Sequence, residues 1–231
     1  MNIVMITTGK RPMISSQAFS SLMSNAADWS SHQMTIVIDS DGHADYENLV
    51  SRYATTIINT KQQGASRSRN IGAASVPKYL RHEHVMFVDD DVYMCPGWDE
   101  RLLAAAGALG PRAVISGHSH PYNLSEGRYK FDGVEVERAG VLSTVNMFME
   151  WAVFDDVGWL CEPGGPGGSE DVDWSRRAVG KGYALAVTVP QCVIHTGEHS
   201  SNGKPIVGYE EVVKRNRRLV SEYKIDDIIF G

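Results

Sequence analysis

Three consecutive carboxylates, Asp89, Asp90 and Asp91, follow directly on the apolar run formed by residues 85–88. An apolar run that contains two valines and no Gly or Pro is typical of a strand covered on both faces of a parallel sheet. Ligands of open α/β sheets bind beyond the carboxyl ends of such strands. If the backbone stays extended, Asp89 and Asp91 point to one side and Asp90 to the other. Two carboxylates on one side suit a hard divalent cation, Mg²⁺ or Mn²⁺, which can in turn hold a diphosphate.

Other structures can also place acids at the end of a strand. A turn followed by a helix N-cap uses Asp in the same way. An EF-hand loop counted from Asp89 is excluded, because its sixth position needs Gly and Met94 stands there. A Walker-B strand ends in similar residues, but the sequence contains no G-x-x-x-x-G-K-[ST] loop. The three aspartates alone do not distinguish between these alternatives, so the other motifs of the chain are needed.

A second acidic stretch begins at Glu170 and Asp171, directly after a segment in which four of the five residues 164–168 are Gly. So many glycines indicate a mobile segment or one that approaches a ligand closely. Ser169 can cap a helix that starts at Glu170, and acids are favoured in the first turn of a helix by its dipole. An acid in that position can also point into a cleft, so the structural and the chemical interpretations are compatible.

Several cationic and imidazole side chains could complete a site. Arg67 and Arg69 lie near the start of a predicted helix, where they could bind phosphate or simply form a solvated helix face. A lone histidine that follows a strand, as His195 does, is usually a satisfied polar residue. For His118 and His120 we expect an ordinary polar loop, because no third metal ligand is close in sequence.

Strands and helices alternate along the first half of the chain, as in the β-α-β units of a nucleotide-binding sheet. We expect strands at residues 2–6, 34–38, 55–58 and 85–88, with helices at 14–27 and 46–53 and one opened by residues 63–72. In the second half we expect helices at 99–109, from residue 170 and at 209–223, strands at 113–116, 143–149, 184–189 and 191–194, and a hairpin at 129–136. The pattern predicts a single α/β domain with a mostly parallel central sheet and flanking helices.

The composition of the 231 residues limits the possible classes of protein. Its three cysteines are widely separated, so neither a disulfide framework nor a cysteine-based zinc site is indicated. The net charge of −6 argues against a general polyanion binder. No apolar stretch approaches the length of a membrane span, and the first strand is too short for the core of a signal peptide. We therefore expect a cytoplasmic protein without an integral membrane segment.

The order of these motifs resembles the GT-A glycosyltransferases, and in particular glycosyltransferase family 2. The resemblance rests on four segments: Asp39 after the second strand, residues 64–72 with their Ser-Arg-Asn-Ile-Gly, the Asp89–Asp91 strand end, and the Glu170-Asp171 helix start. The Gly-Gly before the acids is also similar to the Gly-Gly-Glu-Asp of β-1,4-galactosyltransferases. The resemblance implies a nucleotide-sugar half at about residues 1–97 and an acceptor-binding, catalytic half at about 98–231.

The resemblance also implies roles for individual residues. Asp171 would be the general base, with Glu170 as its less favoured neighbour. Asp91, Asp89 and His195 would bind Mn²⁺ or Mg²⁺. The residues implied in binding the donor are Thr8, Arg11, Asp39, Asp41, Arg67, Arg69, Asn70, Asp89 and Asp90. Which two of the three consecutive aspartates bind ribose and metal is left open by the sequence.

The implied function is transfer of a sugar from a nucleotide-sugar donor, a UDP-sugar, to a hydroxyl acceptor with inversion. A metal-dependent nucleotidyltransferase is one alternative, although the loop after the first strand lacks the expected Gly-rich, Lys-containing sequence. A non-catalytic nucleotide-sugar binding protein is another.

The acceptor could be a glycan, a protein, a lipid-linked sugar or a hydroxylated DNA base. The DNA option rests on the basic cluster 214–218 of the predicted tail helix, for which a solvated face is the default. Trp98, Trp151, Trp159 and Trp174 could stack on a sugar ring, but each is expected to pack in or around the core.

Overall fold

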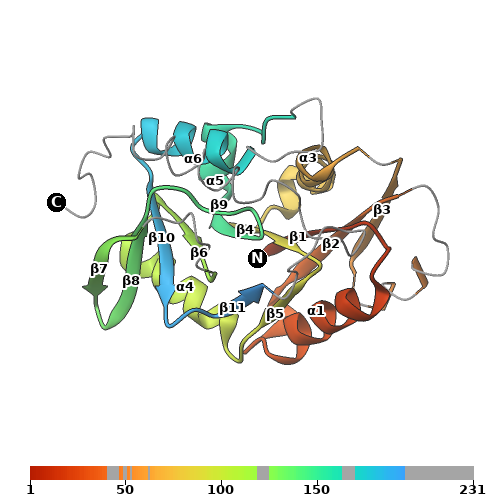
Figure 1. The fold of residues 1–231 in the computed structure, drawn as a ribbon, viewed down its shortest axis with the longest axis horizontal. Helices are drawn as coiled ribbons and strands as arrows, with labels where there is room; N and C mark the ends of the chain where they lie inside the picture. Colours follow the sequence, from red (N-terminus) through yellow and green to blue (C-terminus); the bar gives the residue numbers. More distant parts are fainter. Residues whose placement is uncertain are drawn as a thin grey trace, which may run out of the picture.

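The computed structural model describes residues 1–40, 47–48, 51–52, 54–61, 63–118, 125–162 and 170–195. Its strands form a nine-stranded sheet of order β3-β2-β1-β4-β9-β6-β10-β8-β7 and a separate two-stranded sheet of β11 and β5 (Figure 1). The strands of the large sheet are β1 (Asn2–Thr7), β2 (Gln33–Asp39), β3 (Thr56–Thr60), β4 (His84–Asp89), β6 (Ala113–Ser116), β7 (Ser125–Phe131), β8 (Val134–Ala139), β9 (Asn146–Glu150) and β10 (Ala184–Val189). The small sheet pairs β5 (Val92–Met94) with β11 (Val193–His195).

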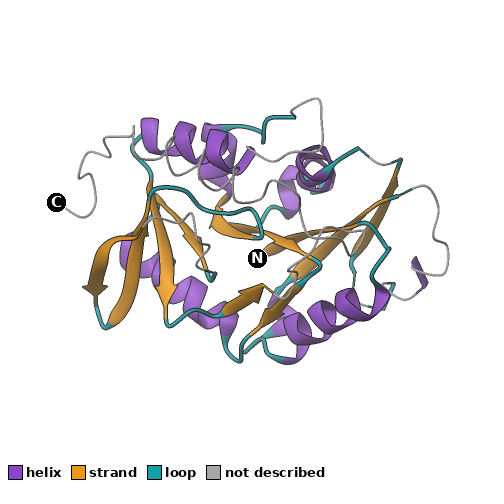
Figure 2. Cartoon of the chain, viewed as in Figure 1, coloured by secondary structure: helices purple, strands orange, loops and turns teal. Residues whose placement is uncertain are grey.

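Helices cover both faces of the large sheet (Figure 2). They are α1 (Pro12–Ser24), α3 (Ala65–Ser75), α4 (Trp98–Leu109), α5 (Trp151–Val157) and α6 (Glu170–Gly180), with short 3-10 turns at Trp29–Ser31 and Lys78–Leu80. In the views of Figures 1 and 2, α1 and α4 lie below the sheet, and α3, α5 and α6 lie above it. None of the helices in the described ranges combines the length and the apolar character needed to cross a bilayer.

The alternation of side chains along each strand produces two apolar layers. Ile3 and Met5 of β1 pack into the core that α1 and α4 complete, whereas Val4 between them packs into the core completed by α3, α5 and α6. The central strand β4 alternates in the same way. Because both faces of the sheet are covered, its central strands read as continuous apolar runs in the sequence.

The directions of the strands bring the ends of several strands to one edge. β3, β2, β1 and β4 are parallel neighbours, and β10 runs parallel to β6. β9 is antiparallel to both β4 and β6, so β6 and β10 point the same way as β4. The carboxyl ends of β1, β2, β4 and β6 therefore lie along the same edge of the sheet, the location expected for a ligand in an open α/β fold.

Most predicted elements agree with the structure. The strand predictions at 113–116 and 184–189 coincide with β6 and β10, and those at 2–6 and 34–38 lie inside β1 and β2. The hairpin is present as β7 and β8, with positive φ at Asp132 and Gly133 of its turn, the geometry that a two-residue hairpin loop requires. Half of the residues of the predicted helix at 46–53, and all of those at 209–223, lie outside the described part of the chain.

Several elements differ from the prediction: β5 was not predicted, and β11 covers Val193–His195 rather than residues 191–194. Helix α1 begins at Pro12 rather than Ile14, because proline is favoured in the first turn of a helix. It ends at Ser24, since Asn25 leaves the helix and donates a side-chain hydrogen bond to the carbonyl oxygen of Met94 at 2.6 Å. The strand predicted at 143–149 is β9, which covers Asn146–Glu150. The residues that follow it, Trp151–Val157, form the helix α5, which was not predicted.

Candidate functional site

A pocket of about 130 Å³ opens at the carboxyl ends of β1, β2 and β4. Its walls come from the loop after β1, the end of β2, the start of α3 and the acidic end of β4. The lining residues are Ile6, Thr7, Thr8, Arg11, Asp39, Ala65, Asp89, Asp90 and Asp91. The structure thus brings together most of the residues that the sequence assigns to donor binding, from four separate segments.

The carboxylate of Asp90 is turned into the protein. It accepts hydrogen bonds from the hydroxyls of Thr7 at 2.5 Å and Ser15 at 2.6 Å, and from the guanidinium of Arg11 at 3.2 Å. Burial raises the pKa of Asp90 in spite of these hydrogen bonds. Asp90 therefore ties the loop after β1 and the first turn of α1 to the strand end. Sequence reasoning gave no role to Thr7 or Ser15, since hydroxyls at such positions carry no pattern of their own.

Asp91 lies between two cationic partners. Arg11 approaches it at 3.1 Å and the Nε2 atom of His195 at 3.2 Å. The contact with His195 arises because β11 pairs with β5, which places His195 opposite Val92, the residue that follows Asp91. Burial alone would raise the pKa of Asp91, but His195 and Arg11 hold it below its ordinary value. Burial likewise disfavours the charged imidazole, yet Asp91 raises the pKa of His195 overall.

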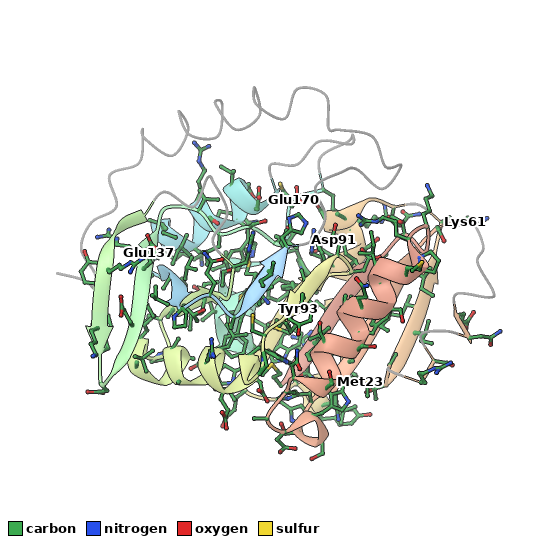
Figure 3. The ribbon with its side chains drawn as sticks, turned by 60° about the horizontal axis from the view of Figure 1, so that its bottom comes forward. Met23, Lys61, Asp91, Tyr93, Glu137 and Glu170 are labelled. Carbon is green, nitrogen blue, oxygen red and sulfur yellow. The ribbon has the colours of Figure 1, made fainter. Side chains whose placement is uncertain are left out.

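Arg69 connects the two acidic stretches of the chain. Its guanidinium forms an ion pair with Asp89 at the end of β4 and lies 3.5 Å from Glu170 at the start of α6. The side chain of Arg69 is only 2% exposed. Burial raises the pKa of Asp89 to about 6, although the charge of Arg69 opposes this shift. Figure 3 shows Asp91 and Glu170 pointing into the same region.

Asp171, next to Glu170 at the start of α6, is a carboxylate with a raised pKa. Burial, and next the negative charge of Glu170, raise its pKa to about 6. One of its oxygens accepts a hydrogen bond from the backbone N–H of Val172 at 2.8 Å. A carboxylate whose pKa lies near the working pH is both ionised and able to accept a proton effectively.

Two other predicted donor residues hold loops in place. Asp39 accepts hydrogen bonds from the hydroxyl of Thr60 at 2.8 Å and from the backbone N–H groups of Gln63 and Gly64, directly before α3. Asn70 on α3 donates to the carbonyl oxygen of Leu160 at 2.9 Å and accepts from its N–H at 3.1 Å. Asp39 thus fixes backbone beside the pocket, and Asn70 ties the backbone of Leu160 to α3.

The remaining predicted residues are placed as follows. The Thr8 hydroxyl is buried at the pocket and has no hydrogen-bond partner among the described residues. Arg67 is exposed on the outer side of α3, facing Glu162 at 4.0 Å. Asp41 and His120 lie outside the described residues. His118, expected to be an ordinary loop residue, lies with its ring centroid 5.8 Å from that of His195. Burial and the charge of His195 lower the pKa of His118 to about 4.

The residues around the pocket fit a divalent cation. Within the described ranges, no three His, Cys, Asp or Glu side chains are grouped as a complete metal cage. Asp91 and His195 nevertheless offer an oxygen and a nitrogen ligand 3.2 Å apart. Mg²⁺ and Mn²⁺ sites often use few protein ligands and take the others from phosphate and water. A pair of protein ligands is therefore suited to a cation that is bound together with a diphosphate.

The chain is similar to known glycosyltransferase structures. A crystal structure of GalNAc-T7 with UDP, GalNAc and Mn²⁺ matches with a TM-score of 0.63 at 13% identity, covering 98% of this chain and 48% of that one. A crystal structure of S. aureus TarS matches with a TM-score of 0.62 at 14% identity, covering 95% of this chain and 38% of that one. This chain therefore spans less than half the length of either protein. At such identities the likeness shows a shared fold, the GT-A fold.

No curated protein shows significant sequence similarity to the chain. The model of the family described as Glycosyl transferase family 2 matches residues 3–154, which include the pocket from Thr7 to Asp91. Glu170 and His195 lie beyond the matched residues and contact Arg69 and Asp91, respectively. Because the match covers well over half of the sequence, the chain belongs to glycosyltransferase family 2.

Proposed function

We propose that this chain transfers a sugar from a nucleotide-diphosphate donor, a UDP-sugar, to an acceptor hydroxyl with inversion of the anomeric centre. The observation that carries this proposal is the ion-pair bridge through Arg69, from Asp89 at the donor pocket to Glu170 beside Asp171. This bridge would keep the pocket for the diphosphate leaving group close to Asp171, the carboxylate that would act as the base.

The donor side is formed by the pocket at the strand ends. The first backbone N–H groups of α3 and the guanidinium of Arg11 are suited to the diphosphate. Asp91 and His195, with Asp89 as the second carboxylate, would hold Mn²⁺ or Mg²⁺, and the bound cation would neutralise the diphosphate as it leaves. Asp90 already accepts hydrogen bonds from Thr7 and Ser15. It would therefore hold the walls of this pocket in place rather than bind the cation.

The acceptor side is organised around Asp171. Its carboxylate would accept the proton of the acceptor hydroxyl while that oxygen forms a bond to the anomeric carbon. On the opposite face the bond from the anomeric carbon to the diphosphate oxygen breaks, and UDP leaves with the electron pair. Asp171 then returns its proton to solvent. Glu170 raises the pKa of Asp171 through its charge and is itself held by Arg69, so we give it a positioning role.

Thermal stability with UDP, UDP-sugars and nucleoside triphosphates, each with and without Mn²⁺, tests the proposal. We expect UDP and at least one UDP-sugar to raise the melting temperature only when the cation is present, because a ligand that binds only the folded state stabilises it. Stabilisation by nucleoside triphosphates alone, with release of free diphosphate, would instead support the nucleotidyltransferase alternative.

An assay for free UDP separates the enzyme from a non-catalytic binding protein. Transferases often hydrolyse their donor slowly when no acceptor is present, so we expect UDP to accumulate with the wild-type chain. Binding of a UDP-sugar without any release of UDP, in the presence of a panel of acceptors, would favour the binding protein. The cluster 214–218, on which the prediction of a DNA acceptor rests, lies outside the described residues.

A further inference from the structure

A second cavity, of about 530 Å³, lies between α3 and the segment Trp159–Glu162. We call it the Trp159 cavity; its lining residues are Arg67, Asn70, Ile71, Ala74, Trp159, Leu160 and Glu162. It shares no lining residue with the donor pocket. Its volume falls within the range of small-molecule sites in proteins, and it is wide open to solvent.

Trp159 is exposed although it is firmly held. The residue is 49% exposed, while its ring packs edge-on against Phe154 with the ring centroids 5.4 Å apart. Its carbonyl oxygen accepts a hydrogen bond from the guanidinium of Arg177 at 2.7 Å. An aromatic ring that is held in place and exposed beside a cavity offers an apolar face on which a ligand ring can stack.

The Trp159 cavity has an apolar part and a polar rim. Ile71, Ala74 and Leu160 contribute the apolar part of its lining. At the rim, the side chains of Arg67 and Glu162 are 56% and 45% exposed and approach each other at only 4.0 Å. An exposed pair at this distance contributes little to stability, so its donors and acceptors are available to a ligand. Both groups are planar and can form paired hydrogen bonds.

The cavity wall is fixed to α3 by Asn70. The side-chain amide of Asn70 is hydrogen-bonded to both backbone groups of Leu160 and donates to the carboxylate of Glu162 at 3.0 Å. The carboxylate of Glu162 and the backbone of Leu160, next to Trp159, are therefore fixed before a ligand binds. This lowers the entropy cost of binding.

We propose that the Trp159 cavity binds a pyranose unit of a saccharide, as a subsite for the acceptor. A pyranose ring presents an apolar C–H face that can lie on the indole and a circle of hydroxyls that can pair with Arg67 and Glu162. Because the charges of Arg67 and Glu162 oppose each other, the cavity is better suited to a neutral sugar than to a phosphorylated ligand. This proposal rests on the proposed function, and it identifies the acceptor of that function as a saccharide.

The test uses the full chain and a panel of neutral disaccharides: chitobiose, cellobiose, maltose and N-acetyllactosamine. Saturable binding is followed by saturation-transfer NMR and by intrinsic fluorescence. We expect at least one disaccharide to bind the wild type, and Trp159→Ala to weaken that binding at least tenfold. Tyr79→Ala is the matched control, because Tyr79 is 84% exposed on a different segment and should leave binding unchanged.

Two further variants keep the test valid if Trp159→Ala perturbs folding. Trp159→Phe should retain part of the binding, and Arg67→Ala should weaken it, since both changes affect exposed groups. Absence of binding by all four disaccharides, or equal binding by the wild type, Trp159→Ala and Arg67→Ala, would overturn the proposal. A peptide that competes at the cavity while the disaccharides do not bind would overturn it as well.

The melting temperature with UDP and Mn²⁺ is measured on the same variants. A response to UDP without any disaccharide binding would contradict the acceptor subsite alone. Disaccharide binding without a response to UDP would contradict the donor chemistry and leave a saccharide-binding site.

Discussion

A guanidinium nitrogen of Arg69 lies 3.5 Å from a carboxylate oxygen of Glu170, 101 residues further along the chain. The same side chain is ion-paired with Asp89, so one buried cation holds two acids from opposite ends of the site. Removing one partner of a buried ion pair leaves the other charge unpaired, which costs more than the pair itself contributes.

We therefore expect Arg69→Met to lower the free energy of unfolding by about 3–5 kcal/mol. Urea denaturation at pH 7 measures the change. Arg128→Met is the control, because Arg128 is 65% exposed and lies 3.7 Å from Glu135; we expect a change within about 0.5 kcal/mol there. Equal effects of the two substitutions would show that the bridge does not stabilise the fold.

The bridge also shows where sequence reasoning succeeds and where it stops. Local pattern is sufficient for the apolar run before Asp89 and for the helix start at Glu170, since each depends on neighbours within a few residues. The alternation along β4 also anticipated that Asp90 would differ from its neighbours. Which cation joins Asp89 to Glu170 depends on how α3 and α6 pack on the sheet, and no local pattern encodes that.

Short elements were missed for the same reason. The strand β5 has only three residues and exists because β11 pairs with it, so its formation depends on a segment about a hundred residues away. Helix α5 carries Trp151, Val153 and Phe154, residue types that favour a strand. Their burial against the face covered by α6 outweighs that preference. The contact between His118 and His195 follows from the adjacent ends of β6 and β11 and could not be read from spacing.

Asp171→Asn should reduce turnover by about 10²–10⁴-fold, the usual contribution of a general base, while UDP binding is retained. Steady-state release of UDP in the presence of acceptor measures the loss, and the thermal response to UDP with Mn²⁺ measures binding. Asp173→Asn on the same helix is the matched control, since Asp173 is partly exposed and ion-paired with Arg177. Normal turnover by the Asp171 variant would exclude it as the base.

The same substitution should stabilise the protein. The pKa of Asp171 is raised from 3.8 to about 6 in the folded chain, so the folded state binds the proton more tightly than the unfolded state. Ionisation at pH 7 therefore opposes folding, and a neutral Asn removes this cost. We expect the free energy of unfolding of Asp171→Asn at pH 7 to rise by about 1–3 kcal/mol, with little difference from wild type at pH 3, where both residues are neutral. A variant less stable than wild type at pH 7 would contradict the conclusion that the ionised Asp171 destabilises the folded state.

Turnover should depend on pH through Asp171. The base acts as its carboxylate, so kcat/KM should rise as the pH increases through about 6 and level off above pH 7. At pH 5 we expect a value about tenfold below the plateau, since only about a tenth of the groups are then ionised. Burial raises the pKa of Asp89 to about 6 as well, so the residual rate of Asp171→Asn should lose only the part of the rise that Asp171 causes. An unchanged profile would assign the titration to Asp89 or another group.

Asp91→Ala should abolish the cation-dependent response to UDP. Asp91 lies 3.2 Å from His195 and 3.1 Å from Arg11. The substitution would therefore remove the proposed carboxylate ligand of the cation and leave His195 without its partner. Melting temperatures with UDP, with and without Mn²⁺, measure the effect, and Asp155→Ala on the surface of α5 is the control. The apo protein should keep most of its stability, because Asp90 still fastens the loop after β1 through Thr7 and Ser15. If the Asp91 variant still gained stability from UDP only in the presence of Mn²⁺, the cation would have to be held elsewhere.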